Sequence, residues 1–220
     1  SNPTGSVAGR ELTEAVGRWA AEHDVWVITD EIYEHLTYDG AEAVSMPVAV
    51  PELVDRCVVL NGVAKTYAMT GWRVGYALAP AEWTKAMLKV QGHSTSNANS
   101  IAQFAAVEAL TGPQESVPAM LAEYTSRRAW LLKALREIPG VTCNEPEGAF
   151  YAFPSVRGCL GPTIHTSDEF ARRLLEDEHT VVTDGAGFGA DGYLRISYAT
   201  SMDQLQEGVT RIRRFVENIK

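Results

Sequence analysis

The chain has 220 residues, of which 45% are hydrophobic and 9% aromatic, a composition typical of a globular protein with a sizeable core. Its 19 basic and 28 acidic residues give a formal net charge of -9, and no run rich in lysine and arginine stands out, which excludes nucleic acid as an expected partner. No apolar run approaches the roughly 20 residues of a membrane span, so we expect no membrane association.

The cysteines and histidines suggest no metal site. Cys57, Cys143 and Cys159 are odd in number and lack the spacing of metal ligands, and the five histidines show no such spacing either. The chain begins with turn residues and shows no secretory signal pattern. We therefore expect a cytoplasmic protein in reducing surroundings, with no bound metal.

The first half of the chain is predicted to alternate helices and strands. Residues 9–24 place apolar side chains at helical spacing, and an apolar run typical of a buried parallel strand follows at 25–30. The same kind of run recurs at 57–62 and at 73–80. Helix, strand, loop and strand in this order indicate an α/β layer structure.

The second half is predicted to combine long helices with short strands. We expect helices near 81–91, 100–110 and 114–137, strands at 141–143 and 148–153, a helix through 178 capped by Thr166 with Glu169, strands at 180–183 and 193–199, and a last helix to about 218 capped by Ser201 with Gln204. The final strand–strand–helix–strand–strand–helix order is typical of an α+β unit. We therefore expect two domains, residues 1–115 and residues 116–220.

Several polar residues lie next to the predicted buried strands. Asp30 and Tyr33 close the first strand, Lys65 follows the second, Arg73 precedes the core of the third, and Arg195 lies inside a later strand. Ligands of open α/β sheets bind beyond the carboxyl ends of the strands, where Asp30 and Lys65 fall. Each residue alone has an ordinary structural explanation, such as a turn, a solvated cation or a core aromatic. Their joint occurrence favours a ligand site.

The stretch around Lys65 and Arg73 is unusual for two cations. They lie eight positions apart among apolar and small residues, with Gly62, Gly71 and Gly75 around them. No carboxylate is near them in sequence, and a solvated face would repeat its charges every few residues. A solvated surface therefore does not explain these two charges.

Five motifs resemble those of one enzyme family. They are NPTG at 2–5, DEIY at 30–33, NGVAKTYAMTGWRVGY at 61–76, PEGAFY at 146–151 and LRISYATS at 194–201. In this order, and over essentially the whole chain, they are similar to the class I aminotransferases of the fold-type I pyridoxal-phosphate superfamily, above all to bacterial aspartate aminotransferases. The resemblance implies a transaminase that uses pyridoxal 5'-phosphate.

The resemblance implies roles for both cations. Lys65 matches the lysine that forms a Schiff base with the cofactor aldehyde and then serves as the general base for the proton shift. Its apolar neighbours and the nearby cation favour the neutral amine. Arg73 matches the arginine that binds the cofactor phosphate through its planar fork. Gly62 and Ala64 stand where many relatives have hydroxyl residues, so phosphate binding would depend more on Arg73.

The remaining motifs supply four further site residues. Asp30 matches the carboxylate that pairs with the pyridine nitrogen and keeps it protonated. Tyr33 and Asn2 match the donors to the phenolic oxygen of the ring. Arg195 matches the arginine that binds the substrate α-carboxylate in a bidentate pair, with Asn2 beside the substrate. Asp184 stands where relatives usually have proline or a small neutral residue, and the sequence offers no physical reason for it.

The resemblance also implies a fold and partners. Residues 1–115 would form the C-terminal part of a large PLP-binding α/β domain, with a partial, mostly parallel sheet, and residues 116–220 a small C-terminal α+β domain. The implied enzyme is a homodimer or higher oligomer that exchanges an amino group between an amino acid, aspartate or glutamate, and a 2-oxo acid. Relatives have a further segment before the NPTG motif, so we expect the 220-residue chain alone to be oligomeric, with weak cofactor binding and little or no activity.

Other functions are compatible with the same motifs. One is a different pyridoxal-phosphate reaction on the same fold, such as a lyase or a non-aspartate transaminase, because a fold does not fix a reaction. Another is a non-catalytic, aminotransferase-like sensor fused to a DNA-binding module, and a third is an inert fragment. A glycine-rich loop upstream would support the enzyme, and a helix-turn-helix there would support the sensor.

Overall fold

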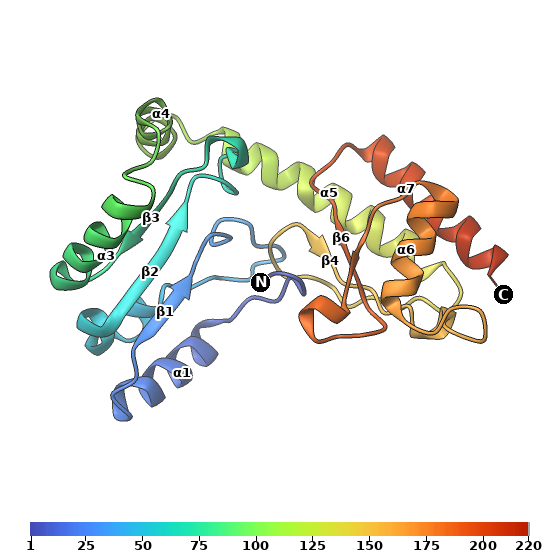
Figure 1. Cartoon of the computed structure of the whole chain (residues 1–220), viewed down its shortest axis with the longest axis horizontal. Helices are drawn as coiled ribbons and strands as arrows, with labels where there is room; N and C mark the ends of the chain where they lie inside the picture. Colours follow the sequence, from blue (N-terminus) through green and yellow to red (C-terminus); the bar gives the residue numbers. More distant parts are fainter. Residues whose placement is uncertain (220) are drawn as a thin grey trace. The chain divides into compact units, whose positions relative to one another are not determined.

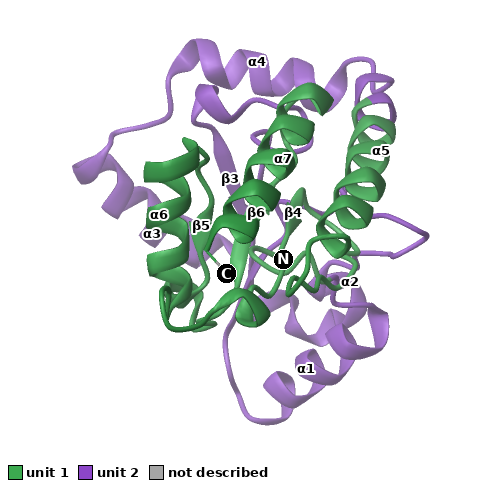
Figure 2. Cartoon of the chain, turned by 90° about the vertical axis from the view of Figure 1, so that its right-hand side faces the viewer, with its two compact units in different colours: residues 1–6, 120–220 green, residues 7–119 purple. Residues whose placement is uncertain are grey.

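The structure is a computed structural model that describes residues 1–219 (Figure 1). By its contacts the chain divides into two compact units, which we describe separately (Figure 2). The N-terminal unit comprises Val7–Ala119, and the C-terminal unit comprises Ser1–Ser6 with Met120–Lys220. Within residues 1–219, no helix is both long and apolar enough to span a membrane.

The N-terminal unit is built on a three-stranded sheet in the order β1-β2-β3. β1 (Val27–Asp30) and β2 (Cys57–Gly62) are parallel, whereas β3 (Gly75–Leu78) runs antiparallel to β2. β2 has the predicted bounds, and β1 and β3 are shorter than predicted. The loop between β2 and β3 contains no α-helix, and a parallel return would need such a crossover, so an antiparallel pairing follows.

Helices α1 (Arg10–Glu22) and α2 (Met46–Ala49) form the core of this unit together with the 3-10 turn Pro51–Arg56 and β2. The buried side chains at its centre are Ala20, Met46, Val50, Leu53, Cys57 and Val59. Gly17 lets α1 approach closely, because a Cβ built there would lie 2.6 Å from Cγ2 of Val50. The sequence predicted α1 but not the short α2.

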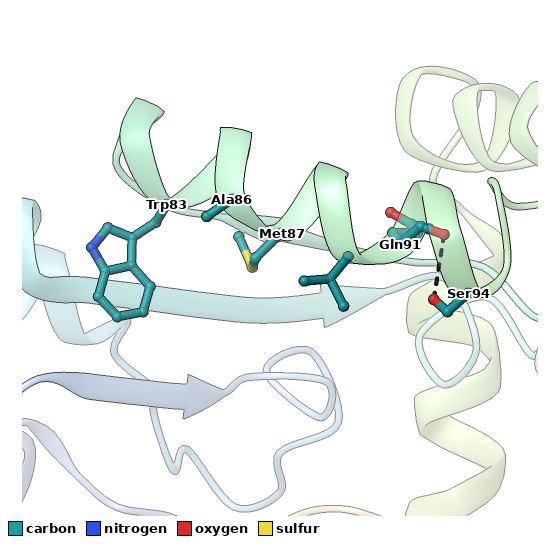
Figure 3. A pocket seen from close by; sticks show the side chains of 6 residues that line it. Trp83, Ala86, Met87, Gln91 and Ser94 are labelled. Carbon is teal, nitrogen blue, oxygen red and sulfur yellow. Dashed lines mark hydrogen bonds between the residues drawn. The ribbon is translucent and has the colours of Figure 1, made fainter.

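Helices α3 (Ala81–Ser94) and α4 (Ser100–Thr111) carry exposed apolar side chains. Phe104 is 79% exposed, and on the sheet Ile28 is 67% and Leu78 is 63% exposed. An open hollow runs along α3 and is lined by Trp83, Ala86, Met87, Val90, Gln91 and Ser94 (Figure 3). Apolar surface of this extent is typical of a face that associates with other protein surface.

The C-terminal unit combines three helices with a three-stranded antiparallel sheet in the order β4-β6-β5. Its elements are α5 (Ser116–Arg136), β4 (Tyr151–Ala152), α6 (Ser167–Glu178), β5 (Thr183–Asp184), β6 (Leu194–Ser197) and α7 (Met202–Asn218). The fully buried rings of Phe170 on α6 and Phe215 on α7 meet edge to face, 5.0 Å apart, which joins the two helices in the core.

Both predicted helix caps are confirmed. Thr166 Oγ1 accepts a hydrogen bond from Glu169 N at 3.2 Å, and Ser201 Oγ accepts one from Gln204 N at 3.3 Å. The carboxylate of Glu169 accepts in turn from His165 N at 2.9 Å, one residue before the cap. These side chains satisfy backbone donors that the first turns of α6 and α7 leave without a helical partner.

The short strands of this unit were predicted less well. The expected strand at 141–143 is reduced to an isolated bridge between Thr142 and Ser155, and the expected strand at 180–183 contributes only its last residue to β5. Val181, at the centre of that expected strand, is 79% exposed. Strand pairing here depends on distant partners, which a short apolar run does not specify.

The boundary between the units differs slightly from residues 115/116. The contacts divide the chain after Ala119, and Ser1–Ser6 group with the C-terminal unit. Gly148 N donates to Gly5 O at 2.7 Å, and a Cβ at Gly5 would lie 2.2 Å from Cβ of Pro146. Glycine at position 5, where φ is +72°, therefore lets the first residues pack against the segment before β4.

An ion pair between α6 and α7 yields a testable prediction. Nε of Arg214 donates to both carboxylate oxygens of Glu178 at 2.9 and 2.8 Å, and Nη2 donates to Oε2. These hydrogen bonds hold the pKa of Glu178 below its ordinary value. A lowered folded-state pKa means that the pair stabilises the fold above the ordinary glutamate pKa and that this stability is lost as the pH falls.

We predict that Glu178→Gln lowers the free energy of unfolding at pH 7 and that its difference from wild type is smaller at pH 3.5, below the ordinary glutamate pKa of about 4.3. Urea unfolding at both pH values measures this. Glu176→Gln, which removes an exposed partner of Arg172, serves as the control and should have a small effect at either pH. A Glu178→Gln deficit that persists or grows in acid would contradict the assignment.

Candidate active site

The register of the N-terminal sheet brings three strand ends to one edge. Asp30, the last residue of β1, pairs with Leu60 of β2, and Gly62 at the end of β2 pairs with Gly75 at the start of β3. The loop that leaves β1 and the one loop that connects β2 to β3 therefore lie at the same edge (Figure 1). These loops carry Tyr33, Lys65 and Arg73, so the structure gathers the predicted residues of this unit there.

The two carboxylates at the end of β1 have different surroundings. Glu31 is held in the fold, because its Oε1 accepts from Ser45 Oγ at 3.0 Å and from Met46 N at 3.1 Å, at the start of α2. Asp30 is exposed at the edge of the sheet, and its Oδ1 accepts from Ile32 N at 3.2 Å. This turn fixes the Asp30 side chain while leaving it accessible to a ligand.

Lys65 and Tyr33 come from neighbouring loops. Nζ of Lys65 lies 5.9 Å from the centroid of the Tyr33 ring. Lys65 is half-buried and is flanked by the buried Val63 and Thr66. The contact places an amine and a phenol together beyond the ends of β1 and β2, which is suited to a ligand that reacts with an amine and accepts a hydrogen bond.

Arg73 has an unusual backbone conformation. Its φ is +55°, in the left-handed region, and its Nη1 donates to Thr70 O at 3.0 Å. Beside it, a Cβ built on Gly62 would lie 3.0 Å from Cα of Gly75, so glycine at position 62 favours the close approach of β2 and β3. The guanidinium is exposed and can offer its N–H fork to an anion.

The C-terminal unit holds the other two predicted residues, Asn2 and Arg195. Arg195 on β6 donates from Nη1 to Asn2 Oδ1 at 2.8 Å and from Nη2 to Thr183 Oγ1 at 3.1 Å. Its Cζ lies 4.8 Å from the Tyr151 ring centroid and 5.2 Å from that of Phe188. A planar cation fixed in this way is suited to binding a carboxylate.

The sequence prediction missed Thr183, Tyr151 and Phe188 as neighbours of Arg195. Tyr151 is the last residue of the PEGAFY motif, and Phe188 lies in the segment that also contains Asp184. Neither stretch of sequence indicates a contact with an arginine. The structure explains Asp184: its Oδ1 accepts from Ser167 Oγ at 2.5 Å and its Oδ2 from Ala186 N at 3.0 Å. This side chain thus holds a loop in place.

Residues 1–219 contain neither a cluster of metal-ligating side chains nor a disulfide. Among residues 1–219, no three His, Cys, Asp or Glu side chains gather as a metal site. The three cysteines are free thiols, and burial raises the pKa of Cys143 to about 11, which makes it a poor nucleophile.

The chain is similar to known proteins over nearly its whole length. A family model described as aminotransferase class I and II matches residues 1–212. An aspartate aminotransferase from Streptomyces avermitilis is 50% identical over 100% of this chain and 55% of its own length. The crystal structure of the aspartate aminotransferase from Rhizobium meliloti matches with a TM-score of 0.93 at 40% identity, over 99% of this chain and 56% of its own.

A further crystal structure, of an aromatic aminotransferase from Pyrococcus horikoshii, matches with a TM-score of 0.91 at 37% identity, over 99% of this chain and 58% of its own. The chain therefore spans a little over half the length of the proteins that it matches.

The left-handed backbone at Arg73 yields a prediction. A residue with a Cβ costs roughly 1–2 kcal/mol in this backbone region. Glycine avoids that cost, but its greater freedom in the unfolded chain cancels part of the gain in stability. Arg73→Gly and Arg73→Ala both lose the bond to Thr70 O, but only glycine relieves the backbone. We predict that Arg73→Gly is more stable than Arg73→Ala by about 1 kcal/mol in urea unfolding. An alanine variant as stable as the glycine variant would show that position 73 carries no strain.

Proposed function

Because the chain belongs to the class I and II aminotransferases, we propose that it works, as part of a longer enzyme, to transfer an amino group between an amino acid and a 2-oxo acid with pyridoxal 5'-phosphate. The observation that carries this proposal is the convergence of Asp30, Lys65 and Arg73 on one sheet edge. We take aspartate or glutamate as the amino donor, which the name of the Streptomyces avermitilis relative supports.

The residues at the sheet edge fit this cofactor by their chemistry. The ligand has a basic ring nitrogen, an aldehyde and a phosphate, and the edge presents a carboxylate, an amine and a guanidinium. The bound group would supply an electron-withdrawing ring that carries an aldehyde. Asp30 would accept the N–H of the ring nitrogen and so keep its proton in place. Arg73 would hold the phosphate through paired N–H donors.

Lys65 has the central part in this proposal. Its Nζ would take the proton from the α-carbon of the substrate as a general base and hold it for the transfer that follows, in which it would act as the general acid. The phenol of Tyr33 would donate to the ring oxygen, with Asn2 as the second donor. The loops that carry Tyr33 and Lys65 follow β1 and β2, and the parallel pairing of these strands holds them side by side.

Arg195 would bind the α-carboxylate of the substrate. A guanidinium forms two parallel hydrogen bonds to a carboxylate, so it fixes the orientation of the substrate as well as its position. The bonds to Asn2 and Thr183 support this role, because they hold the plane of the fork. Every amino acid substrate has this carboxylate, so Arg195 would not select among side chains.

We also propose a homodimer or higher oligomer that acts in the cytoplasm. The exposed apolar side chains of α3, α4 and the sheet support association, because such surface is costly to leave in water. The free thiols support reducing surroundings.

An assay of amino transfer from aspartate to 2-oxoglutarate, run on the protein that carries this chain, tests the function. We predict that Lys65→Ala lowers turnover at least a hundredfold, about the contribution of a general base. Lys89→Ala, a lysine on α3, should leave it unchanged. Turnover by the Lys65→Ala variant within tenfold of wild type would contradict the role of Lys65, and no turnover by the wild-type protein would favour the sensor alternative.

A second variant tests the role of Asp30. Asp30→Ala removes the carboxylate that would keep the ring nitrogen protonated. We predict at least a tenfold loss of kcat, about 1.4 kcal/mol of barrier, with the fold unchanged. Asp55→Ala, an exposed aspartate in the turn before β2, serves as the control. A loss smaller than tenfold would remove Asp30 from the proposed mechanism.

A further inference from the structure

Two aromatic rings pack against the guanidinium of Arg195. Its Cζ lies 4.8 Å from the centroid of Tyr151 on β4 and 5.2 Å from that of Phe188 in the loop after β5. Arginine stacks on such rings through its planar faces, while its N–H donors point outward in the plane. Asn2 Oδ1 and Thr183 Oγ1 engage two of these five donors. The rings and the hydrogen bonds thus act on different parts of the same group.

We propose that Phe188 and Tyr151 are positioning residues that fix the plane of Arg195 for carboxylate binding, and that Ser167 holds Phe188 in place. This inference rests on the proposed function, in which Arg195 binds the substrate α-carboxylate. A carboxylate must approach in the plane of the guanidinium to form two bonds. A guanidinium that rotates freely offers that geometry only part of the time and must be ordered on binding.

Both rings are supported by their own neighbours. Tyr151 is buried and pairs with Ser197 of β6, the strand of Arg195. The ring of Phe188 meets that of Phe153 edge to face at 6.2 Å, and Phe153 stacks on Tyr193 at 5.1 Å. Phe188 itself is 39% exposed, so its ring is not held by burial alone. Its position depends on the loop that carries it.

Phe188 lies in residues 184–192, which we call the Phe188 loop. Ser167 contacts both ends of this loop. Ser167, the first residue of α6, is fully buried, and its Oγ lies 2.5 Å from Asp184 Oδ1 and 2.8 Å from Asp191 Oδ1. The same Oγ accepts from Gly192 N at 2.9 Å, and Ser167 N donates to Asp191 Oδ1 at 3.0 Å. The hydroxyl has one proton to donate, which Asp184 and Asp191 share, and it accepts from Gly192, so it links the first residue of the loop to its last two.

In this arrangement Asp184 has a structural role. Thr183, immediately before it, accepts from Arg195, and Asp184 fixes the turn that follows through Ala186 N. The two contacts that this segment makes with Arg195, through Thr183 and Phe188, thus lie on either side of Asp184 and share its anchor on α6. Thr183 is also held by the pairing of its backbone with Arg195, so a loose loop would release the contact of Phe188 first.

The test compares Phe188→Leu with Phe188→Tyr in the protein that carries this chain. Leucine keeps an apolar side chain but removes the flat ring, whereas tyrosine retains it. Succinate is the probe, because it offers carboxylates and has no amine to react. Side-chain 15N NMR gives the rotation rate about the Nε–Cζ bond of Arg195 and, by titration, succinate affinity. Arg195→Lys identifies the arginine signal, and thermal unfolding by circular dichroism confirms that each variant is folded.

We expect Phe188→Leu to speed rotation and to weaken succinate binding about tenfold, the scale of a cation–aromatic contact, while Phe188→Tyr resembles wild type. Ser167→Ala should shift both quantities in the same direction as Phe188→Leu, and Phe104→Leu, an exposed ring on α4, should shift neither. Unchanged rotation and affinity in Phe188→Leu would overturn the proposal.

The same experiment distinguishes a failure of the proposed function from a failure of this positioning proposal. If succinate does not affect the Arg195 signal of the wild-type chain, Arg195 loses its assigned role in substrate binding. The rotation rates then still decide whether Phe188 positions the guanidinium, because they are measured without a ligand.

Discussion

The pairing of β2 with both of its neighbours decides where the charged side chains of the N-terminal unit lie. Parallel pairing aligns the ends of β1 and β2, and antiparallel pairing brings the start of β3 to the same edge. Gly62 and Gly75 permit this close approach, because a Cβ at Gly62 would lie 3.0 Å from Cα of Gly75. A carboxylate from the end of β1 and an amine and a guanidinium from the loop between β2 and β3 therefore share one edge.

In the C-terminal unit, several elements together orient one arginine. A single strand residue, Arg195, is contacted by side chains from the first residues of the chain, from β4, from β5 and from the loop after β5. Local order in that loop comes from Ser167, at the start of a helix whose cap was evident in the sequence. The same helix start thus serves the fold and the arrangement of side chains around Arg195.

The sequence predicted features that depend on local chemistry. A continuous apolar run gave β2 its bounds, and hydroxyl side chains three residues before a polar partner marked the caps of α6 and α7. The sequence did not predict features that depend on distant partners, such as the reduction of 141–143 to a bridge, or the contacts of Arg195 with Phe188 and Thr183. The roles of Asp30, Lys65 and Arg73 came from a resemblance, and spacing alone would not have distinguished them from turn and surface residues.

Our central proposal is that the sheet edge would hold pyridoxal 5'-phosphate through Lys65. The most direct measurement is borohydride reduction after incubation with this compound, followed by peptide mapping of the modified lysine in the protein that carries this chain. The account predicts that the label is on the peptide containing Lys65 and is lost in Lys65→Ala. A label on Lys85 or Lys89 of α3, with Lys65 unmodified, would contradict it.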